Sequence, residues 1–523
     1  MKMKPIVVFT PIVLLALCVL ATLSAGDSFA EGVTNVNNVV LQNFGWLFDL
    51  GVFTITISLF VAYFTPLGKV KIGGRKAKPL ISKRTYFAVA LCTMVATGMP
   101  IWGAAEIMAH YSNPPESEGI AAMSVAAAKF GLRTVFLNYT FAPLAVYVMP
   151  TILIAFAFYN MKTSFSLSAM LAPVFGKKVE GRGGQIVDAI CIFTLVCGLI
   201  TSIGNGSDSL IYGLSQLTGG HITKNALTVT ILIIVISVTF VVSSATGLQK
   251  GIKFLSNLNI YFFIVLLVFV FVVGPTALIM NLGVETVGSF MTHFVGDMLN
   301  TRALTGDNWA YYWTIFYFAV YLAWALISAA FLARVSYGYT VRHIITWIFI
   351  MPSLFSGVWM LVFSITTLHM ELNGLGMAAA YAENYGSVII KLFQNLPLST
   401  LFIAAFIFML FLSFVTAADS CTNAIAGLCT VGLDTEDAEP PMKMKVFWGV
   451  LMGIASLFAC QLLDINGLKA MCNVGSVPAL IIEVIGIFAF YRIMMKPGRY
   501  DVHKEDYDEY GNPLPQEEER MKI

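Results

Sequence analysis

Residues 310–333 of the chain have the sequence AYYWTIFYFAVYLAWALISAAFLA, which contains no charged side chain. A helix of about 20 apolar residues spans the hydrocarbon core of a bilayer, so this stretch predicts a transmembrane helix. Its aromatic residues follow a pattern: Trp313, Tyr317, Tyr321 and Trp324 are spaced by four, four and three residues. That spacing places the four rings on one face of the helix.

Similar apolar runs recur along the whole chain. Of its 523 residues, 58% are hydrophobic and 11% are charged, against roughly 25% charged residues in a soluble domain. Runs long enough to cross a membrane lie at 5–25, 41–64, 86–111, 136–160, 185–215, 225–246, 252–280, 310–333, 343–369, 398–432, 444–463 and 470–494. We therefore predict an all-α membrane protein with about twelve transmembrane helices, in contact with membrane lipids.

The basic residues predict the orientation, because Lys and Arg are retained on the cytoplasmic side of a membrane. With the N-terminus inside, 25 of the 31 Lys and Arg residues fall in inner segments and 6 in outer segments. Both termini are therefore predicted to be cytoplasmic. The first run, 5–25, imitates a secretory signal but is long for one, so we interpret it as a retained helix. Outer segments near 284–300 and 379–395 are apolar enough for helices that lie along the membrane surface.

Several function classes lack their signatures in this sequence. The net charge is +2, and no basic cluster is interleaved with aromatic residues as nucleic-acid readers require. The six histidines are scattered, with no H-E-x-x-H pair for metal-dependent hydrolysis. We therefore expect no nucleic-acid partner, no enzymatic activity and no cofactor other than a coupling ion. A channel remains an alternative, and it would pass ions without an organic solute.

Chemistry inside a membrane protein is expected where apolar helices are interrupted. In the third span, Gly98 and Pro100 break the helix, which fits an ordinary kink and a binding site equally well. Glu106 follows, either as a paired helix-end residue or as a functional one. The tenth span holds the polar stretch SFVTAADSCTN at 413–423, whose hydroxyls either pack between helices or bind sodium.

The aromatic face of the eighth span also has two interpretations. Trp313 lies near the predicted outer end, where an interfacial aromatic belt accounts for it. Tyr321 and Trp324 lie roughly two turns deeper in the membrane, where an interfacial belt does not account for them. Stacked ring faces at that depth suit a quaternary ammonium ion, which is attracted by aromatic rings and cannot form hydrogen bonds.

These residues resemble the betaine/carnitine/choline transporter family. The resemblance covers most of the chain and rests on the motifs WTIFY at 313–317, FLARVS at 331–336, GLQKGIK at 247–253, LSN at 255–257, LPLS at 396–399 and FVTAADS at 414–420. It implies a LeuT-like fold with two inverted five-helix repeats, and a homotrimer. The domains that follow are two peripheral helices and a basic loop in 1–85, the first repeat in 86–281, an interfacial linker helix in 282–309, the second repeat in 310–495 and a polar cytoplasmic tail in 496–523.

The resemblance also implies a substrate site at the centre of the membrane. Tyr139 takes the place of a family tryptophan in the fourth span, and Tyr321 and Trp324 match two aromatic positions in the eighth. Val320 replaces another family tryptophan, and Ala109 stands where a carnitine exchanger has tyrosine. The aromatic cage is therefore reduced, which favours a smaller, less methylated or differently shaped zwitterion. We also expect Trp313 and Tyr317 to form an outer gate or waiting site.

Coupling to sodium is implied only in part. Asn259 and Ser328 replace the arginine and methionine of sodium-independent carnitine exchangers. Thr416 matches a sodium-site hydroxyl, with backbone carbonyls near Gly98 as further ligands, but Ala417 stands where a serine is expected. The hypothesis is a secondary transporter of the bacterial inner membrane that moves a betaine-, carnitine- or choline-like solute, with sodium symport favoured over sodium-independent exchange.

Overall fold

The computed structural model describes residues 3–25, 27–247, 251–433, 439–462 and 465–515. Within these ranges the regular secondary structure is helical, and strand pairing is confined to three isolated bridges. The sequence motif at 247–253 includes residues 248–250, which lie outside the described residues, as does the end of the tail from residue 516 onward.

The spans agree with an all-α membrane protein of the predicted class. In the described ranges, ten helical segments are long and apolar enough to cross a membrane, and α3 with α4 forms a further span bent by 51°. α19 lies at the predicted span 444–463 and is not among these eleven. The first five spans after the N-terminal pair are α3 (Lys83–Met94) with α4 (Met99–Ser112), α5 (Val125–Tyr139) with α6 (Phe141–Ala155), α8 (Arg182–Leu217), α9 (Ala226–Thr246) and α10 (Lys253–Val273). The next five are α13 (Thr314–Val335), α14 (Val341–Ile345) with α15 (Met351–Leu372), α18 (Ser399–Leu428), α19 (Met442–Leu462) and α20 (Ile465–Met495).

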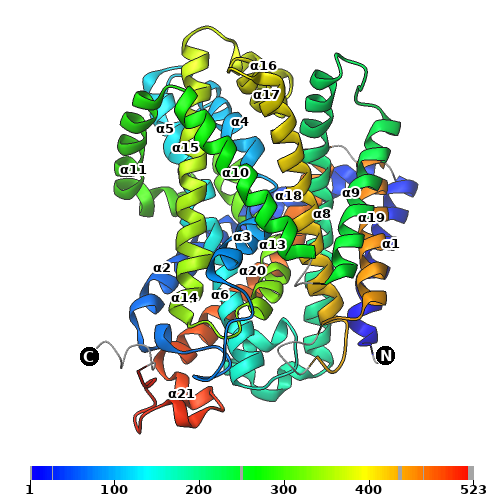
Figure 1. The fold of residues 1–523 in the computed structure, drawn as a ribbon, viewed down its shortest axis with the longest axis vertical. Coiled ribbons are helices and arrows are strands. Elements are labelled where there is room, and N and C mark those ends of the chain that lie inside the picture. The colour runs from blue at the N-terminus through cyan, green and yellow to red at the C-terminus, as the bar shows by residue number, and fades with distance from the viewer. Residues whose placement is uncertain (1–2, 26, 248–250, 434–438, 463–464, 516–523) are drawn as a thin grey trace.

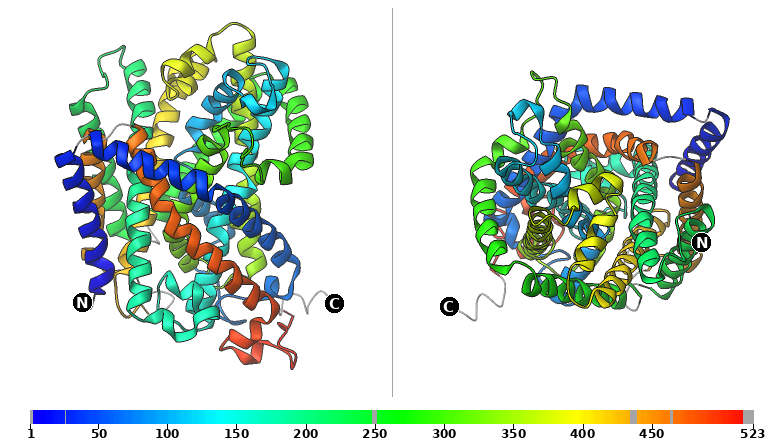
Figure 2. Two further views of the ribbon diagram at one scale, coloured as in Figure 1. Left: turned by 180° about the vertical axis from the view of Figure 1, so that it is seen from behind. Right: turned by 90° about the horizontal axis from the view of Figure 1, so that it is seen from above.

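These two sets of five spans have opposite orientations. Neither α19 nor α11 (Thr276–Met298) is among the eleven candidate spans. If α19 crosses, as predicted, and α11 does not, each set crosses five times, and the second set begins on the other side of the membrane from the first. That relation is the inverted repeat of many secondary transporters. α1 (Pro5–Ala25) and α2 (Asp27–Phe64) lie at the edge of the bundle, and α2 runs obliquely along its outside (Figure 2).

Short helices cover the two ends of the bundle. α16 (Met377–Glu383) and α17 (Ser387–Gln394) lie at one end, near the predicted outer segment 379–395, and α11 lies along the side of the molecule (Figure 1). At the opposite end, α21 (Pro497–Tyr500) begins a folded segment of the tail. There, the N–H of Val502 donates to Asn160 at 2.8 Å and that of Arg75 to Asp506 at 2.6 Å. The tail up to residue 515 is therefore attached to the loops at that end of the bundle.

The loops at the α16 end are joined by one buried arginine. Arg302 contacts Glu118 at 3.0 Å and Asp307 at 3.9 Å, donates to Ser117, and lies over the ring of Trp309. Partial burial of Asp307 acts to raise its pKa, but hydrogen bonds from Ser117 and from the backbone N–H of Trp309, with the charge of Arg302, hold that pKa below its usual range. This contact connects the loop after α4 to the segment before α13, and we name it the outer latch because the sequence predicts that end to be the outer one.

Three helix interruptions surround the centre of the molecule. The break between α3 and α4 falls at 95–98, where Pro100 in the first turn of α4 has no N–H to continue the helix. Thr140, with φ −109° and ψ −129°, separates α5 from α6, and Trp313, with φ −122° and ψ −86°, separates the short α12 (Trp309–Tyr312) from α13. α13 is buried along nearly its whole length and packs against α6, α8, α18 and α20.

Candidate functional site

A cavity lies between the helix interruptions. Its volume is about 90 Å³. Its lining comes from α3, α4, the end of α5, α6, α8 and α13. The aromatic lining residues are Trp102, Tyr139, Tyr147, Phe316, Tyr317, Tyr321 and Trp324, and the polar ones are Thr93, Thr97 and Ser202. No charged side chain is among the residues that line it.

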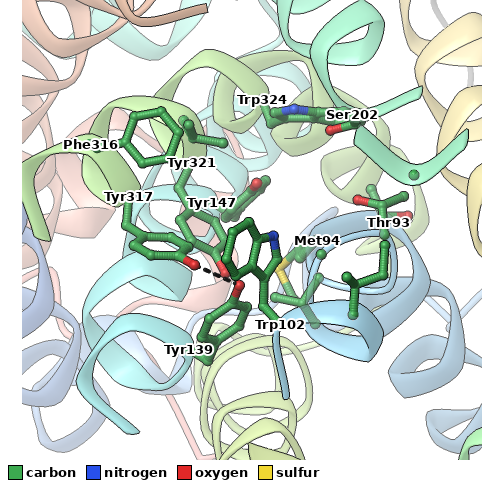
Figure 3. A pocket seen from close by; sticks show the side chains of 16 residues that line it. Thr93, Met94, Trp102, Tyr139, Tyr147, Ser202, Phe316, Tyr317, Tyr321 and Trp324 are labelled. Atoms are coloured by element: carbon green, nitrogen blue, oxygen red, sulfur yellow. Dashed lines mark hydrogen bonds between the residues drawn. The ribbon is translucent and has the colours of Figure 1, made fainter. Parts of the chain in front are cut away.

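Four tyrosines form one wall of the cavity. The ring of Tyr321 lies 6.5 Å from that of Tyr139 and 6.1 Å from that of Tyr147, nearly perpendicular to both. Tyr317 lies 5.3 Å from Tyr139 between ring centroids, and their hydroxyl oxygens are 3.0 Å apart (Figure 3). Trp324 and Ser202 lie together on another side of the cavity (Figure 3). Ring faces therefore surround a space that lacks a charged group.

Two glycines of α8 allow the rings of neighbouring helices to pack closely. A Cβ atom at Gly198 would lie 2.9 Å from Nε1 of Trp324, and one at Gly206 would lie 1.8 Å from Cζ of Phe414. Each ring occupies the volume that a side chain at the glycine would need. These contacts fix the position of α8 against α13 and α18.

A second aromatic layer lies between the cavity and the α16 end. Trp102 stacks on Tyr385 with ring centroids 5.0 Å apart and planes 4° apart, and meets Trp313 edge to face at 6.2 Å. Trp313 also contacts the ring of His110 at 4.5 Å. Because Trp102 lines the cavity and Tyr385 precedes α17, this layer separates the cavity from that end of the molecule.

A fully buried carboxylate, Glu106, lies behind the tyrosine wall. It accepts hydrogen bonds from Nδ2 of Asn138 at 2.8 Å and from the hydroxyl of Tyr317, and lies 3.2 Å from Nε2 of His110. Asn138 and Tyr317 donate to this carboxyl group, and the role of the His110 nitrogen depends on its tautomer. Glu106 is therefore not a surface helix-end residue, and it reaches the cavity through Tyr317.

The protein-family model for betaine/carnitine/choline family transporters matches residues 6–499. The chain belongs to this family. It is a transporter rather than an enzyme, as the sequence predicted.

The relatives of this transporter are named for different solutes. It is 29% identical to the ectoine/hydroxyectoine transporter of Virgibacillus pantothenticus, over 87% of this chain and 89% of the relative. It is 29% identical to the glycine betaine transporter OpuD of Bacillus subtilis, over 96% of both chains, and 28% identical to the osmo-independent choline transporter BetT1 of Acinetobacter baylyi, over 82% of both. Among solved structures, a Na⁺-coupled sialic acid symporter in a substrate-bound, outward-open state matches 85% of this chain and 87% of its own, with 11% identity and a TM-score of 0.48.

The predicted site residues of this transporter fall into two groups. Tyr139, Tyr317, Tyr321, Trp324 and Gly98 all line the central cavity. The remaining two, Trp313 and Thr416, do not line it. Trp313 belongs to the second aromatic layer because the chain leaves helical geometry at that residue. Thr416 is buried in α18 and donates to the carbonyl oxygen of Leu412 at 2.9 Å.

Thr416 lies in a polar contact among α3, α10 and α18. Nδ2 of Asn259 donates to Oγ of Ser413 at 2.9 Å and to Sγ of Cys92 at 3.6 Å, and the thiol of Cys92 also contacts Thr416. One turn further along α18, Thr93 donates to Ser420 at 3.2 Å. The amide oxygen of Asn259 is buried and has no hydrogen-bond partner among the described residues.

The lining residues that were not predicted from the sequence include Trp102, Tyr147 and Ser202. Trp102 has a signal in hindsight, because it follows the break at Gly98 by one turn and its N–H donates to Gly98 at 3.1 Å. Tyr147 and Ser202 lie in long apolar helices where no pattern distinguishes them from packing residues.

Proposed function

We propose that this protein takes up a small betaine-, carnitine- or choline-like solute across the bacterial inner membrane by alternating access. The observation that carries the proposal is the central cavity, where the rings of Tyr139, Tyr321 and Trp324 surround a space without a charged lining residue. A desolvated organic cation is attracted to such ring faces, by roughly 0.5–2 kcal/mol for each well-placed ring. The names of the ectoine, glycine betaine and choline relatives support a solute of this class.

The other end of the solute is proposed to bind at the break between α3 and α4. The first turn of α4 begins beside Gly98, and the N-terminus of a half-helix attracts a carboxylate or hydroxyl oxygen. The hydroxyls of Thr93 and Ser202 add hydrogen-bonding groups to the lining. A zwitterion would thus lie with its cation at the tyrosine wall and its acid group towards α3.

Alternating access requires a barrier on each side of the cavity. We propose the aromatic layer of Trp102, Trp313 and Tyr385 as the outer barrier, with Tyr317 at its inner edge. Towards the other end, Arg334 donates to Asn423 at 3.0 Å, and Ser243 to Asp419. These are candidates for the inner barrier, because polar contacts between helices can be exchanged for water when the helices separate.

We propose sodium as the coupling ion. Oxygen atoms of Thr416, Ser413 and Asn259 come together where α18 meets α3 and α10, and the unpartnered amide oxygen of Asn259 is the type of ligand a hard cation takes. The sequence predicted a sodium site made of Thr416 and backbone carbonyls near Gly98. We add Ser413 and Asn259 to these proposed ligands. Bound sodium would supply positive charge that holds α3 against α18.

We further propose that both termini are cytoplasmic and that the protein forms a homotrimer. The bias of basic residues supports the orientation, and α21 and the first turn of α1 lie at the same end of the bundle (Figure 1). The trimer rests on the family resemblance alone.

The test is uptake into proteoliposomes of labelled glycine betaine, carnitine, choline and taurine, each with and without an inward sodium gradient. We expect saturable uptake of at least one ammonium solute, stimulated by sodium and reduced about tenfold or more by Trp324→Leu. Trp46→Leu is the matched control, because Trp46 is 54% exposed on α2, outside the cavity.

Other outcomes separate the alternatives. Uptake that needs the same solute inside and ignores sodium would indicate exchange. Ion currents without any solute would indicate a channel. Folded protein that takes up none of the four solutes, nor ectoine, would refute the proposed substrate class.

A further inference from the structure

A chain of hydroxyl groups connects the buried carboxylate of Glu106 to the cavity. Tyr317 donates to Glu106, and the hydroxyl oxygens of Tyr317 and Tyr139 lie 3.0 Å apart. Glu106 itself does not line the cavity, whereas both tyrosines do. Tyr139 is the member of this hydrogen-bonded series that lies farthest from Glu106.

The direction of the hydrogen bonds follows from counting protons. A phenol carries one proton, and that of Tyr317 is directed to Glu106. The distance between the two hydroxyl oxygens allows either tyrosine to donate. Because the proton of Tyr317 is given to Glu106, we assign the donor role to Tyr139. The oxygen of Tyr139 is left with its lone pairs free and with no proton to offer to the cavity. It lies near the helix break, 3.9 Å from the position of a Cβ atom on Gly98.

Tyr139 is thus a hydrogen-bond acceptor at the place where the cationic head of a solute is expected. A phenol oxygen at the start of a series of hydrogen bonds that ends on a carboxyl group is a stronger acceptor than an isolated one, because bonds in such a series polarise one another. A quaternary ammonium ion carries only methyl or methylene groups on nitrogen and cannot donate to it. An ammonium or amidinium ion with an N–H group can.

We infer that the site prefers, over a fully methylated betaine, a solute whose cationic nitrogen carries at least one N–H, which donates to the hydroxyl oxygen of Tyr139. Tertiary, secondary and primary ammonium zwitterions and protonated cyclic amidines belong to this class, and fully methylated betaines do not. The inference rests on the proposed function and narrows its substrate. Around the same space, Val320 contributes an aliphatic side chain to the lining, so the ring faces do not close around the head on every side.

The experiment compares two zwitterions that differ by one methyl group, dimethylglycine and glycine betaine. Their affinities are measured by competition against a labelled solute that the proteoliposomes take up. We expect wild-type protein to bind dimethylglycine about ten- to a hundredfold more tightly, the range for a hydrogen bond from a charged donor. Tyr139→Phe removes the acceptor and keeps the ring, so it should bring the affinity ratio of the two solutes close to one.

Tyr491→Phe is the matched control. It removes a phenol hydroxyl that accepts a hydrogen bond from Ser58, between α20 and α2 and outside the cavity, and should leave the ratio at its wild-type value. Glycine betaine bound as tightly as dimethylglycine by wild-type protein would overturn the inference while the proposed function stands. An unchanged ratio in Tyr139→Phe would also overturn it. If folded wild-type protein takes up no ammonium solute, the proposed function fails and the inference fails with it.

Discussion

Replacing Glu106 with glutamine tests whether the buried carboxylate attracts the cation of the solute. The hydroxyl chain sets the distance: Tyr317 contacts the carboxylate, and Tyr139 follows 3.0 Å further on. A cation against Tyr139 therefore lies roughly 8 Å from the carboxylate. With an effective dielectric constant of about 20, two opposite unit charges at that distance attract by about 2 kcal/mol, or about thirtyfold in affinity.

We expect Glu106→Gln to weaken binding of every cationic solute by about tenfold to thirtyfold. Glutamine has nearly the shape of glutamate and can still accept from Asn138, so the fold should persist. Binding is measured by calorimetry or by a radioligand assay in detergent, with thermal unfolding as the check on folding. The matched control is Glu371→Gln, because Glu371 accepts from the N–H of Ala378 at 2.9 Å at the end of α15, away from the cavity.

A loss of affinity below about threefold in a stably folded Glu106→Gln protein would refute the electrostatic reasoning. It would mean that the carboxyl group of Glu106 does not attract a cation in the cavity. An equal loss in Glu371→Gln would show that the effect is not local to the site.

Three further predictions concern packing, coupling and the outer latch. Gly206→Ala places a methyl group 1.8 Å from Cζ of Phe414, so it should lower the free energy of unfolding by about 1–3 kcal/mol and lower the thermal midpoint. Thr416→Ala removes a proposed sodium ligand, so the sodium concentration for half-maximal uptake should rise about tenfold. Asp307→Asn should destabilise the protein at pH 7, and its difference from wild type should shrink as the pH falls below about 4, because the lowered pKa of Asp307 stabilises only the ionised form.

Each of these variants has a control in the same chain. Gly98→Ala adds a methyl group whose nearest neighbours are 3.9 Å away, so an equal fall in thermal midpoint would contradict the packing argument. Thr422→Ala removes a hydroxyl that donates only to its own helix at Ala418, so it should leave the sodium dependence unchanged. For the outer latch, a stability difference that is as large at pH 3 as at pH 7 would show that Asp307 acts through packing rather than through its charge.

The sequence was sufficient to predict the aromatic residues that α13 contributes to the cavity, because they share one helix and their regular spacing reveals a common face. Tyr317, Tyr321 and Trp324 follow that spacing and all line the cavity. Trp313 has the same spacing but does not line the cavity. The helix is interrupted at this residue, and the indole ring contacts Trp102 and His110 instead. Periodicity assumes a continuous helix, and it fails at the residue where the helix begins.

The remainder of the site could not be predicted, because its residues are brought together by tertiary packing. Ser202 lies on α8, and two of its neighbours on that helix are Gly198 and Gly206, whose role appears only when Trp324 and Phe414 are seen against them. Glu106 had two readings in the sequence, a helix-end residue or a functional group. Its partners Asn138 and Tyr317 come from two other helices, and no local pattern connects the three.

The segment 92–98 is the physical link between the two proposed binding events. Cys92 and Thr93 contact α18 at Thr416 and Ser420, where sodium is proposed to bind. Met94, Val95, Thr97 and Gly98 line the cavity a few residues further on. A cation that holds the first part of this segment against α18 also fixes the second part, and so lowers the cost of ordering the cavity around a solute. Such coupling is reciprocal. Bound sodium and bound solute should therefore each raise the affinity of the protein for the other by the same factor.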